Sequence, residues 1–250
     1  MLKIFITGAS SGIGESLARH YAGQGAQLAL VARRGDWLDR VAASLTPKPE
    51  CYVCDVRDAK ALMSAAVDFM AKHGVPNIVI ANAGVSRGTL TEIEDDLPAF
   101  QDIFDINVMG MVNTFHPFVE PMKAKGGGTL VGIASVAGFR GIPGGGAYSA
   151  SKAAVIRYCE SLRVELRSAG VAVVTICPGY IRTPMTAVNK FKMPFLIDVD
   201  QAVIRFARAI ERKTSFTVIP WSMGIAARLL RIAPNWLYDR VFQRMPRKPR

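Results

Sequence analysis

Short apolar segments alternate along the chain with longer segments in which apolar residues recur every three or four positions. The short runs are typical of buried strands, and the recurring spacing is typical of helices with one buried face. We expect strands at residues 2–7, 27–31, 50–55, 77–81, 129–134, 171–177 and 216–219. We expect helices from Gly14 onward and at residues 36–45, 58–72, 97–123, 148–168 and 200–212, with the 97–123 helix bent or ended near Pro117. Strands that are apolar on both faces and separated by helices predict an α/β domain, a doubly wound parallel sheet of seven strands with helices on both faces.

The last 30 residues differ in character from the rest. We assign residues 1–220 to the α/β domain and residues 221–250 to a basic, amphipathic C-terminal helical extension. The extension contains seven Lys or Arg residues and one acidic residue, Asp239, and Pro234 divides its two helical stretches. Such helices can lie in a membrane interface, cover a neighbouring subunit, or form a lid on their own domain. The sequence leaves these three alternatives open.

Composition and charge narrow the function classes. The 250 residues are 50% hydrophobic and 20% charged, which excludes a disordered chain. No apolar run approaches the roughly 20 residues that a membrane-spanning helix needs. The net charge of +11 could attract nucleic acid, acidic lipid or a phosphorylated cofactor. No nucleic-acid-binding motif is present, so we expect no nucleic-acid partner.

The four cysteines, Cys51, Cys54, Cys159 and Cys177, point to reduced thiols. Cys51 and Cys54 have CxxC spacing, but residues three apart on a strand point to opposite faces. No second pair completes a tetrahedral site, so we expect no metal. The first strand begins at residue 2, which leaves no room for a signal peptide. We therefore expect a cytoplasmic protein, with membrane association through the extension as an alternative.

A glycine-rich turn joins the first strand to the first helix. Residues 7–14 read TGASSGIG. Glycines let the backbone approach a pyrophosphate closely, and the free N–H groups of the following helix favour its charge. The candidate cofactor residues in this turn are Gly8, Ser10, Ser11, Gly12, Ile13 and Gly14.

Two arginines follow the second strand, where a dinucleotide's adenosine ribose would lie. An acidic residue there suits the 2′-hydroxyl of NAD, and arginine suits the 2′-phosphate of NADP. Arg33 and Arg34 occupy these positions, and no carboxylate comes before Asp36. The sequence therefore favours NADP(H).

Tyr148 and Lys152 lie four residues apart on an expected helix, so they share one face. A lysine ammonium about 4 Å away would lower the phenol pKa from near 10 toward neutrality, which suits an acid–base catalyst. Ser135 follows the fifth strand, at the edge where open α/β sheets bind ligands, and its hydroxyl can bond to a substrate carbonyl.

These motifs together resemble the short-chain dehydrogenase/reductase family, in the single-domain form with TGxxxGIG and YxxxK, over residues 1 to about 220. The resemblance implies a Rossmann-type fold and assigns roles to further residues. It implies adenine contacts from Asp55 and Val56, a sheet-stabilising segment Asn82-Ala83-Gly84 beside the cofactor, a proton-relay asparagine at Asn107, a catalytic Ser135, Tyr148 and Lys152, the last also binding the nicotinamide ribose, and cofactor contacts from Pro178, Gly179, Ile181 and Thr183.

The resemblance also implies a homodimer or homotetramer built on the helices at 97–123 and 148–168. Residues 184–198 lie where the family has a mobile lid, and their apolar members are Met185, Phe191, Met193, Pro194, Phe195 and Leu196. We expect a small-molecule substrate, a hydrophobic ketone or secondary alcohol, interconverted with NADP(H) and with Tyr148 as general acid/base. The alternative is a non-catalytic NADP-sensing interaction protein, against which the intact catalytic set argues.

Overall fold

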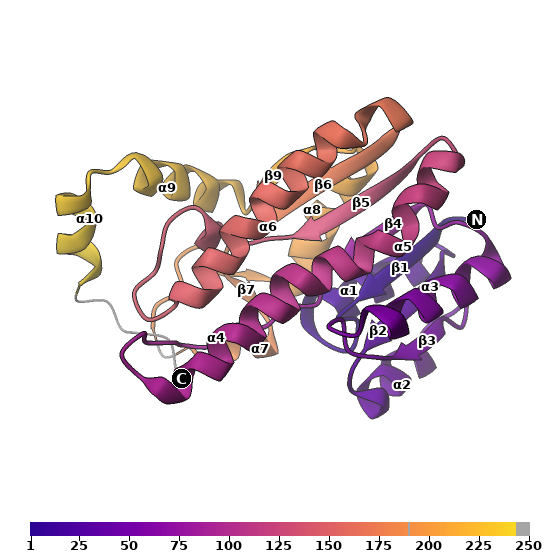
Figure 1. Cartoon of the computed structure of the whole chain (residues 1–250), viewed down its shortest axis with the longest axis horizontal. Coiled ribbons are helices and arrows are strands. Elements are labelled where there is room, and N and C mark those ends of the chain that lie inside the picture. The colour runs from indigo at the N-terminus through magenta and orange to yellow at the C-terminus, as the bar shows by residue number, and fades with distance from the viewer. Residues whose placement is uncertain (190, 244–250) are drawn as a thin grey trace.

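A seven-stranded sheet forms the centre of the structure, a computed structural model that describes residues 1–189 and 191–243 (Figure 1). The strands are β1 (Lys3–Thr7), β2 (Gln27–Ala32), β3 (Glu50–Val53), β4 (Ile78–Ala81), β5 (Gly128–Ile133), β6 (Val171–Pro178) and β9 (Phe216–Ile219). Their order is β3-β2-β1-β4-β5-β6-β9, and every neighbouring pair is parallel. The predicted doubly wound sheet is confirmed.

Helices cover both faces of the sheet. They are α1 (Gly12–Ala22), α2 (Gly35–Ala43), α3 (Ala59–His73), α4 (Leu97–Phe104), α5 (Gly110–Ala124), α6 (Gly146–Glu165), α7 (Pro184–Ala187), α8 (Val199–Glu211), α9 (Trp221–Ile232) and α10 (Asn235–Phe242). A separate pair of two-residue strands, β7 (Ile181–Arg182) and β8 (Ile197–Asp198), brackets α7.

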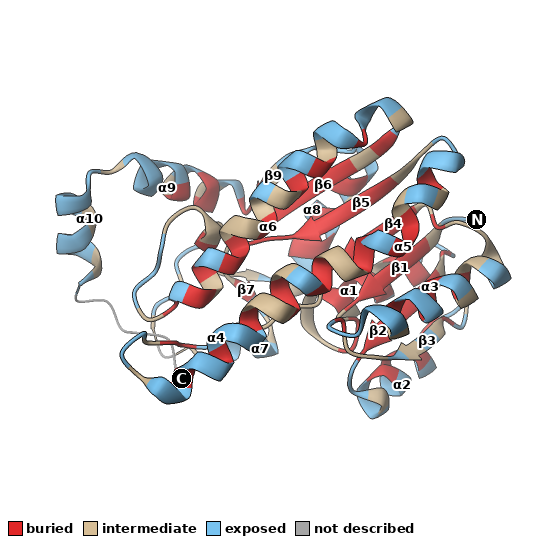
Figure 2. Cartoon of the chain, in the orientation of Figure 1, coloured by how far each residue is buried: buried red, intermediate tan, exposed pale blue. Residues whose placement is uncertain are grey.

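The two faces of the sheet bury two separate cores, because successive side chains on a strand point to opposite sides. On β1, Ile4 and Ile6 join the core beneath α1, α2 and α8, whereas Phe5 joins the core beneath α3, α5 and α6. Figure 2 shows the central strands buried, the edge strands β3 and β9 partly exposed, and the helices buried on their inner sides. This double burial explains why the strands are apolar without alternation.

The helix does not end near Pro117, which was one of the two outcomes expected there. The helix is interrupted earlier, by a π-helical turn at Asp105–Met109, and α5 then continues through Pro117 to Ala124. Proline removes one backbone hydrogen bond from a helix. Phe115, Phe118 and Met122 of α5 are fully buried, and this packing outweighs the lost hydrogen bond.

The carboxyl ends of the sheet strands all meet at one edge, because the strands are parallel. The turns after β1, β2, β4, β5 and β6 therefore lie close together, and they carry the predicted motifs. Among the described residues, none of the helices has both the length and the apolar character that crossing a bilayer requires.

Candidate active site

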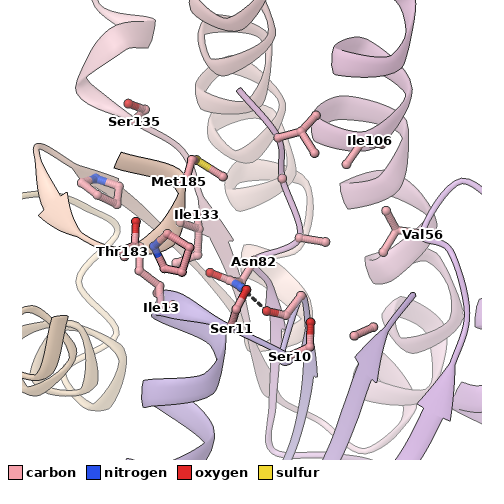
Figure 3. Close-up of a pocket in the computed structure, with 18 of the residues that line it drawn as sticks. Ser10, Ser11, Ile13, Val56, Asn82, Ile106, Ile133, Ser135, Thr183 and Met185 are labelled. Atoms are coloured by element: carbon pink, nitrogen blue, oxygen red, sulfur yellow. Dashed lines mark hydrogen bonds between the residues drawn. The ribbon is translucent and has the colours of Figure 1, made fainter. Parts of the chain in front are cut away.

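A cleft of about 390 Å³ opens at the carboxyl edge of the sheet. Of the residues predicted from the sequence, it is lined by Gly8, Ser10, Ser11, Gly12, Ile13, Arg33, Arg34, Asp55, Val56, Asn82, Ala83, Gly84, Ser135, Tyr148, Lys152, Pro178, Gly179, Ile181 and Thr183. Figure 3 shows Asn82 near the centre of the lining, with Thr183 and Met185 on one side and Val56 and Ile106 on the other. Two predicted residues, Gly14 and Asn107, lie behind the lining and support it.

The glycine-rich turn is packed so tightly that side chains would not fit. Gly8 has φ +68°, and a Cβ there would lie 2.8 Å from the Cα of Ala83. A Cβ on Gly14 would lie 2.2 Å from the carbonyl oxygen of Gly8. Gly14 thus closes the turn against the start of α1, and the exposed side of the turn presents Ser10, Ser11 and Gly12 to the cleft. This cradle at a helix N-terminus fits a dinucleotide pyrophosphate.

Asn82 ties the end of β4 to the end of β1. Its side-chain amide donates to the carbonyl oxygens of Thr7 at 3.1 Å and Gly8 at 3.2 Å, and its backbone N–H donates to the hydroxyl of Thr7 at 3.2 Å. Two carbonyl groups at the end of a strand thereby gain a donor. Asn82 fixes the shape of the turn from the side opposite α1.

Asn107 holds the loop after β4 against α6. Its carbonyl oxygen accepts from the backbone N–H of Val85 at 2.8 Å, and its amide donates to the carbonyl of Val85 and the hydroxyl of Ser151, both at 3.0 Å. Ser151 in turn donates to the backbone carbonyl of Tyr148 at 2.8 Å. The side chain that the resemblance assigns to a proton relay is buried here as a link between the cleft wall and the helix of Tyr148.

Ser135 and Tyr148 approach each other from different elements. Ser135 follows β5, and its hydroxyl accepts from the backbone N–H of Ala137 at 3.1 Å. Tyr148 lies in the first turn of α6. Burial raises the pKa of the Tyr148 phenol above its usual value, and a hydrogen bond with Ser135 opposes that rise. The phenol is therefore protonated at neutral pH in this arrangement.

Lys152 lies beneath the phenol and is buried. Its ammonium group donates to the backbone carbonyl of Ile133 at 2.9 Å and lies 5.8 Å from the centre of the Tyr148 ring. Burial lowers the pKa of Lys152 to about 8. We expected the ammonium to lower the pKa of Tyr148, but the direction found here is the opposite. Desolvation is the largest cause for both residues and favours the neutral form of each.

The two arginines after β2 occupy different surroundings. Arg33 lies 3.5 Å from the carboxylate of Asp55, and both side chains are partly exposed. Arg34 donates to the hydroxyl of Ser11 at 3.3 Å and stacks over the ring of Trp37 at 4.0 Å. Both guanidinium groups therefore line the same end of the cleft, next to the glycine-rich turn.

Several lining residues were not predicted. They are Ala32, Cys54, Val85, Ile106, Ile133, Ala134, Pro184 and Thr186. Most of them lie next to predicted residues at strand ends, so their position after a strand is a signal that could have found them. Ile106 has no such signal, because it reaches the cleft through the π-helical turn.

The segment at 184–198 contributes less to the cleft than expected. Of its apolar residues in the prediction, Met185 lines the cleft, and the other five are not among the lining residues. Phe191 instead packs edge-to-face on Tyr180 at 6.2 Å. Ile181 pairs with Ile197, so the end of the segment lies beside its beginning. The described residues of the segment that line the cleft are Pro184, Met185 and Thr186 of α7.

The four cysteines are free thiols. Within residues 1–189 and 191–243, no three His, Cys, Asp or Glu side chains are grouped so that they could hold a metal ion.

Comparison of the sequence with known proteins identifies a family. The family model for short chain dehydrogenases matches residues 3–193. An uncharacterized oxidoreductase of Myxococcus xanthus is 37% identical over 245 residues, which cover 96% of each chain. The chain therefore belongs to the short-chain dehydrogenase family, whose members are oxidoreductases that use a nicotinamide cofactor.

Solved structures share the fold. A variant of the actinorhodin polyketide ketoreductase, determined with NADPH, has a TM-score of 0.78 at 24% identity and covers 87% of this chain and 95% of its own. A 3-ketoacyl-(acyl-carrier-protein) reductase from Brucella melitensis, complexed with NADH, has a TM-score of 0.80 at 23% identity and covers 87% and 96%. At these identities the two structures support the fold alone.

Replacing Asn82 by Ala should destabilise the fold. The change leaves the carbonyl oxygens of Thr7 and Gly8 without their side-chain donor, so we expect the free energy of unfolding to fall by about 1–3 kcal/mol. Chemical denaturation measures this loss. Asn82→Asp keeps the size but faces the same carbonyls with a carboxylate, and should be at least as destabilising. Equal stability of all three proteins would show that the contact contributes nothing.

Lys152 should make the stability depend on alkaline pH. Between about pH 8 and the unfolded pKa near 10.4, the unfolded chain binds this proton more fully than the folded chain. The free energy of unfolding should therefore rise with pH there, by up to about 1.4 kcal/mol per pH unit from this group. Denaturation at several pH values should show this rise in the wild type and in Lys60→Met, whose lysine is exposed on α3. A rise of equal slope in Lys152→Met would contradict the assignment.

Proposed function

We propose that this protein is an NADP(H)-dependent oxidoreductase that interconverts a hydrophobic ketone and the corresponding secondary alcohol. The observation that carries the proposal is the meeting of the Ser135 hydroxyl and the Tyr148 phenol in the cleft, above the buried amine of Lys152. These three groups can bind a carbonyl oxygen and exchange a proton with it.

The protonation state of Tyr148 favours carbonyl reduction. A neutral phenol can donate its proton to the carbonyl oxygen as negative charge develops there, while the Ser135 hydroxyl holds the same oxygen. The bound cofactor supplies the hydride that completes the reduction. Lys152, with a pKa of about 8, is mostly protonated at pH 7 and places a positive charge near the phenolate that remains.

Arg33 and Arg34 support the choice of NADP(H) over NAD(H). Both line the cleft at the end of β2, and a guanidinium can bind a phosphate through two parallel hydrogen bonds. Asp55 also lines this end of the cleft. Its carboxylate cannot bind a phosphate, but it lies within ion-pair distance of Arg33, which offsets its negative charge. The balance of charge at the site thus suits a 2′-phosphate.

The wall of the cleft supports a hydrophobic substrate. Val85, Ile181 and Met185 line it together with the catalytic candidates. Met185 is exposed and unbranched, so it can adapt to substrates of different shapes.

The proposal includes the assembly and the compartment expected from the sequence, a homodimer or homotetramer in the cytoplasm. Leu97 and Phe100 on α4 and Val164 on α6 are exposed apolar residues, which supports a homodimer or homotetramer through these helices. The free cysteines support a reducing compartment, the cytoplasm.

Tyr148→Phe should remove the proton donor and preserve the ring. We expect kcat/KM for ketone reduction to fall by about 10²–10⁴-fold, with the Kd for NADPH unchanged. The measurement is NADPH oxidation with a panel of hydrophobic ketones. Tyr158→Phe is the matched control, because Tyr158 lies on the same helix and stacks on Phe115 at 6.4 Å. A wild-type chain that binds NADPH tightly and reduces none of the ketones would favour the non-catalytic sensor instead.

Arg33→Ala should weaken NADPH binding and leave NADH binding nearly unchanged. Loss of a charge-assisted contact to the 2′-phosphate predicts a rise in the Kd for NADPH of roughly 10–100-fold. Titration of both cofactors by protein fluorescence measures the ratio. Arg40→Ala, which removes an exposed arginine on α2, serves as the control. Equal weakening of both cofactors would remove Arg33 from phosphate recognition.

A further inference from the structure

The two C-terminal helices, α9 and α10, extend away from the sheet at one end of the molecule (Figure 1). Figure 2 shows that both helices are largely exposed. Among the described residues of the extension, none lines the cleft. The described part of the extension, residues 221–243, therefore contributes no wall to the cleft.

Arg140 attaches the extension to the domain. This residue lies in the loop between β5 and α6, and its guanidinium donates to the carbonyl oxygens of Leu230 and Ala233, the latter at 2.6 Å. It also donates to the side chain of Asn235 at 2.9 Å and stacks over the ring of Tyr238 at 4.0 Å. The Tyr238 hydroxyl donates to the carbonyl of Gly141. These contacts determine which side of each helix faces the domain.

The solvent-exposed side of α9 is apolar, and its last turns, at Arg228 and Ile232, border a hollow against α6 and β9 of the domain. Met223 and Ala227 are buried against the domain. Trp221, Ile225, Leu229 and Ile232 follow one another at helical spacing, and they are exposed by 72%, 49%, 60% and 79%. On α10, Trp236, Leu237 and Val241 are exposed in the same way. A stripe of this kind in water costs free energy unless something covers it.

Basic residues lie within the same surface. Arg228 lies four residues before Ile232, and Arg240 lies four residues after Trp236, so both belong to the exposed apolar faces. Arginine and tryptophan together on an exposed amphipathic helix suit the headgroup level of a bilayer.

We propose that the exposed surface of α9 and α10, defined by Trp221, Ile225, Leu229, Ile232, Trp236 and Val241 with Arg228 and Arg240, docks on an anionic lipid bilayer. The positive charge of this surface favours an anionic bilayer over a second copy of the chain. A second copy of this chain docked face to face here would bring Arg228 and Arg240 close to the same arginines of its partner. A bilayer with anionic headgroups supplies the opposite charge around the arginines and an apolar layer for the stripe.

The docking does not depend on the proposed reaction and needs no substrate to test. Full-length protein is sedimented with phosphatidylcholine vesicles, with and without phosphatidylglycerol. We expect binding to the anionic vesicles only, weakening as salt is added. The double variants Trp221→Ser with Trp236→Ser and Arg228→Glu with Arg240→Glu should each reduce the bound fraction by roughly tenfold or more.

Matched controls separate this surface from general effects. Val67→Ser and Lys60→Glu change an exposed apolar residue and an exposed cation on α3, and should bind like the wild type. A measurement on the unmodified protein avoids any folding defect of the variants. Tryptophan emission should shift to shorter wavelength when anionic vesicles are added.

Three results would overturn the proposal. One is wild-type protein that stays in the supernatant with anionic vesicles and shows no emission shift. Another is binding that is unchanged in both double variants. The third is a tryptophan variant whose oligomer dissociates in sedimentation velocity while the wild type binds no vesicles, which would assign the surface to a second copy of the chain.

Discussion

The hydrogen bonds of Asn82 join the end of β4 to the end of β1, at the point in the sheet where the order of strand addition reverses. The chain builds β1, β2 and β3 outward on one side, then returns to place β4 on the other side of β1. The crevice left at this reversal is where open α/β sheets bind ligands. The Asn82 amide donates to the carbonyl oxygens of Thr7 and Gly8 there, which fixes the end of β1 and the start of the glycine-rich turn. The cofactor cradle depends on this arrangement.

The chemistry of the cleft follows from burial. Tyr148 and Lys152 are both removed from water, and each is pushed toward its neutral form. A neutral phenol is a proton donor, which is the state that carbonyl reduction requires at the start of the reaction. Ser135 opposes this rise in the pKa of Tyr148 through its hydrogen bond to the phenol. Ser135 comes from the turn after β5 and the other two side chains from α6, which Asn107 links through Ser151 to the loop after β4.

Hydrogen bonding and burial also determine how the C-terminal extension is attached to the domain. Arg140, in the loop that precedes Tyr148, donates three hydrogen bonds to it and stacks on Tyr238, while Met223 and Ala227 are buried against the domain, so polar and apolar contacts together attach the extension. This attachment leaves the large apolar side chains facing outward. The loop therefore connects the catalytic helix to the surface that we propose for lipid.

The sequence by itself determined the strands, the helices, the glycine-rich turn and the residue types of the site. Those features depend on local spacing: apolar runs, glycines beside a helix start, and Tyr148 one turn from Lys152. Only the tertiary structure decided which contacts the buried groups make. It gave Asn107 a linking position in a π-helical turn, directed the amine of Lys152 to Ile133, carried α5 through Pro117, and turned Phe191 away from the cleft. It also determined which side of α9 is buried against the domain and which side is exposed. Each of these outcomes depends on partners distant in the chain, and on the desolvation that they impose, which local spacing does not encode.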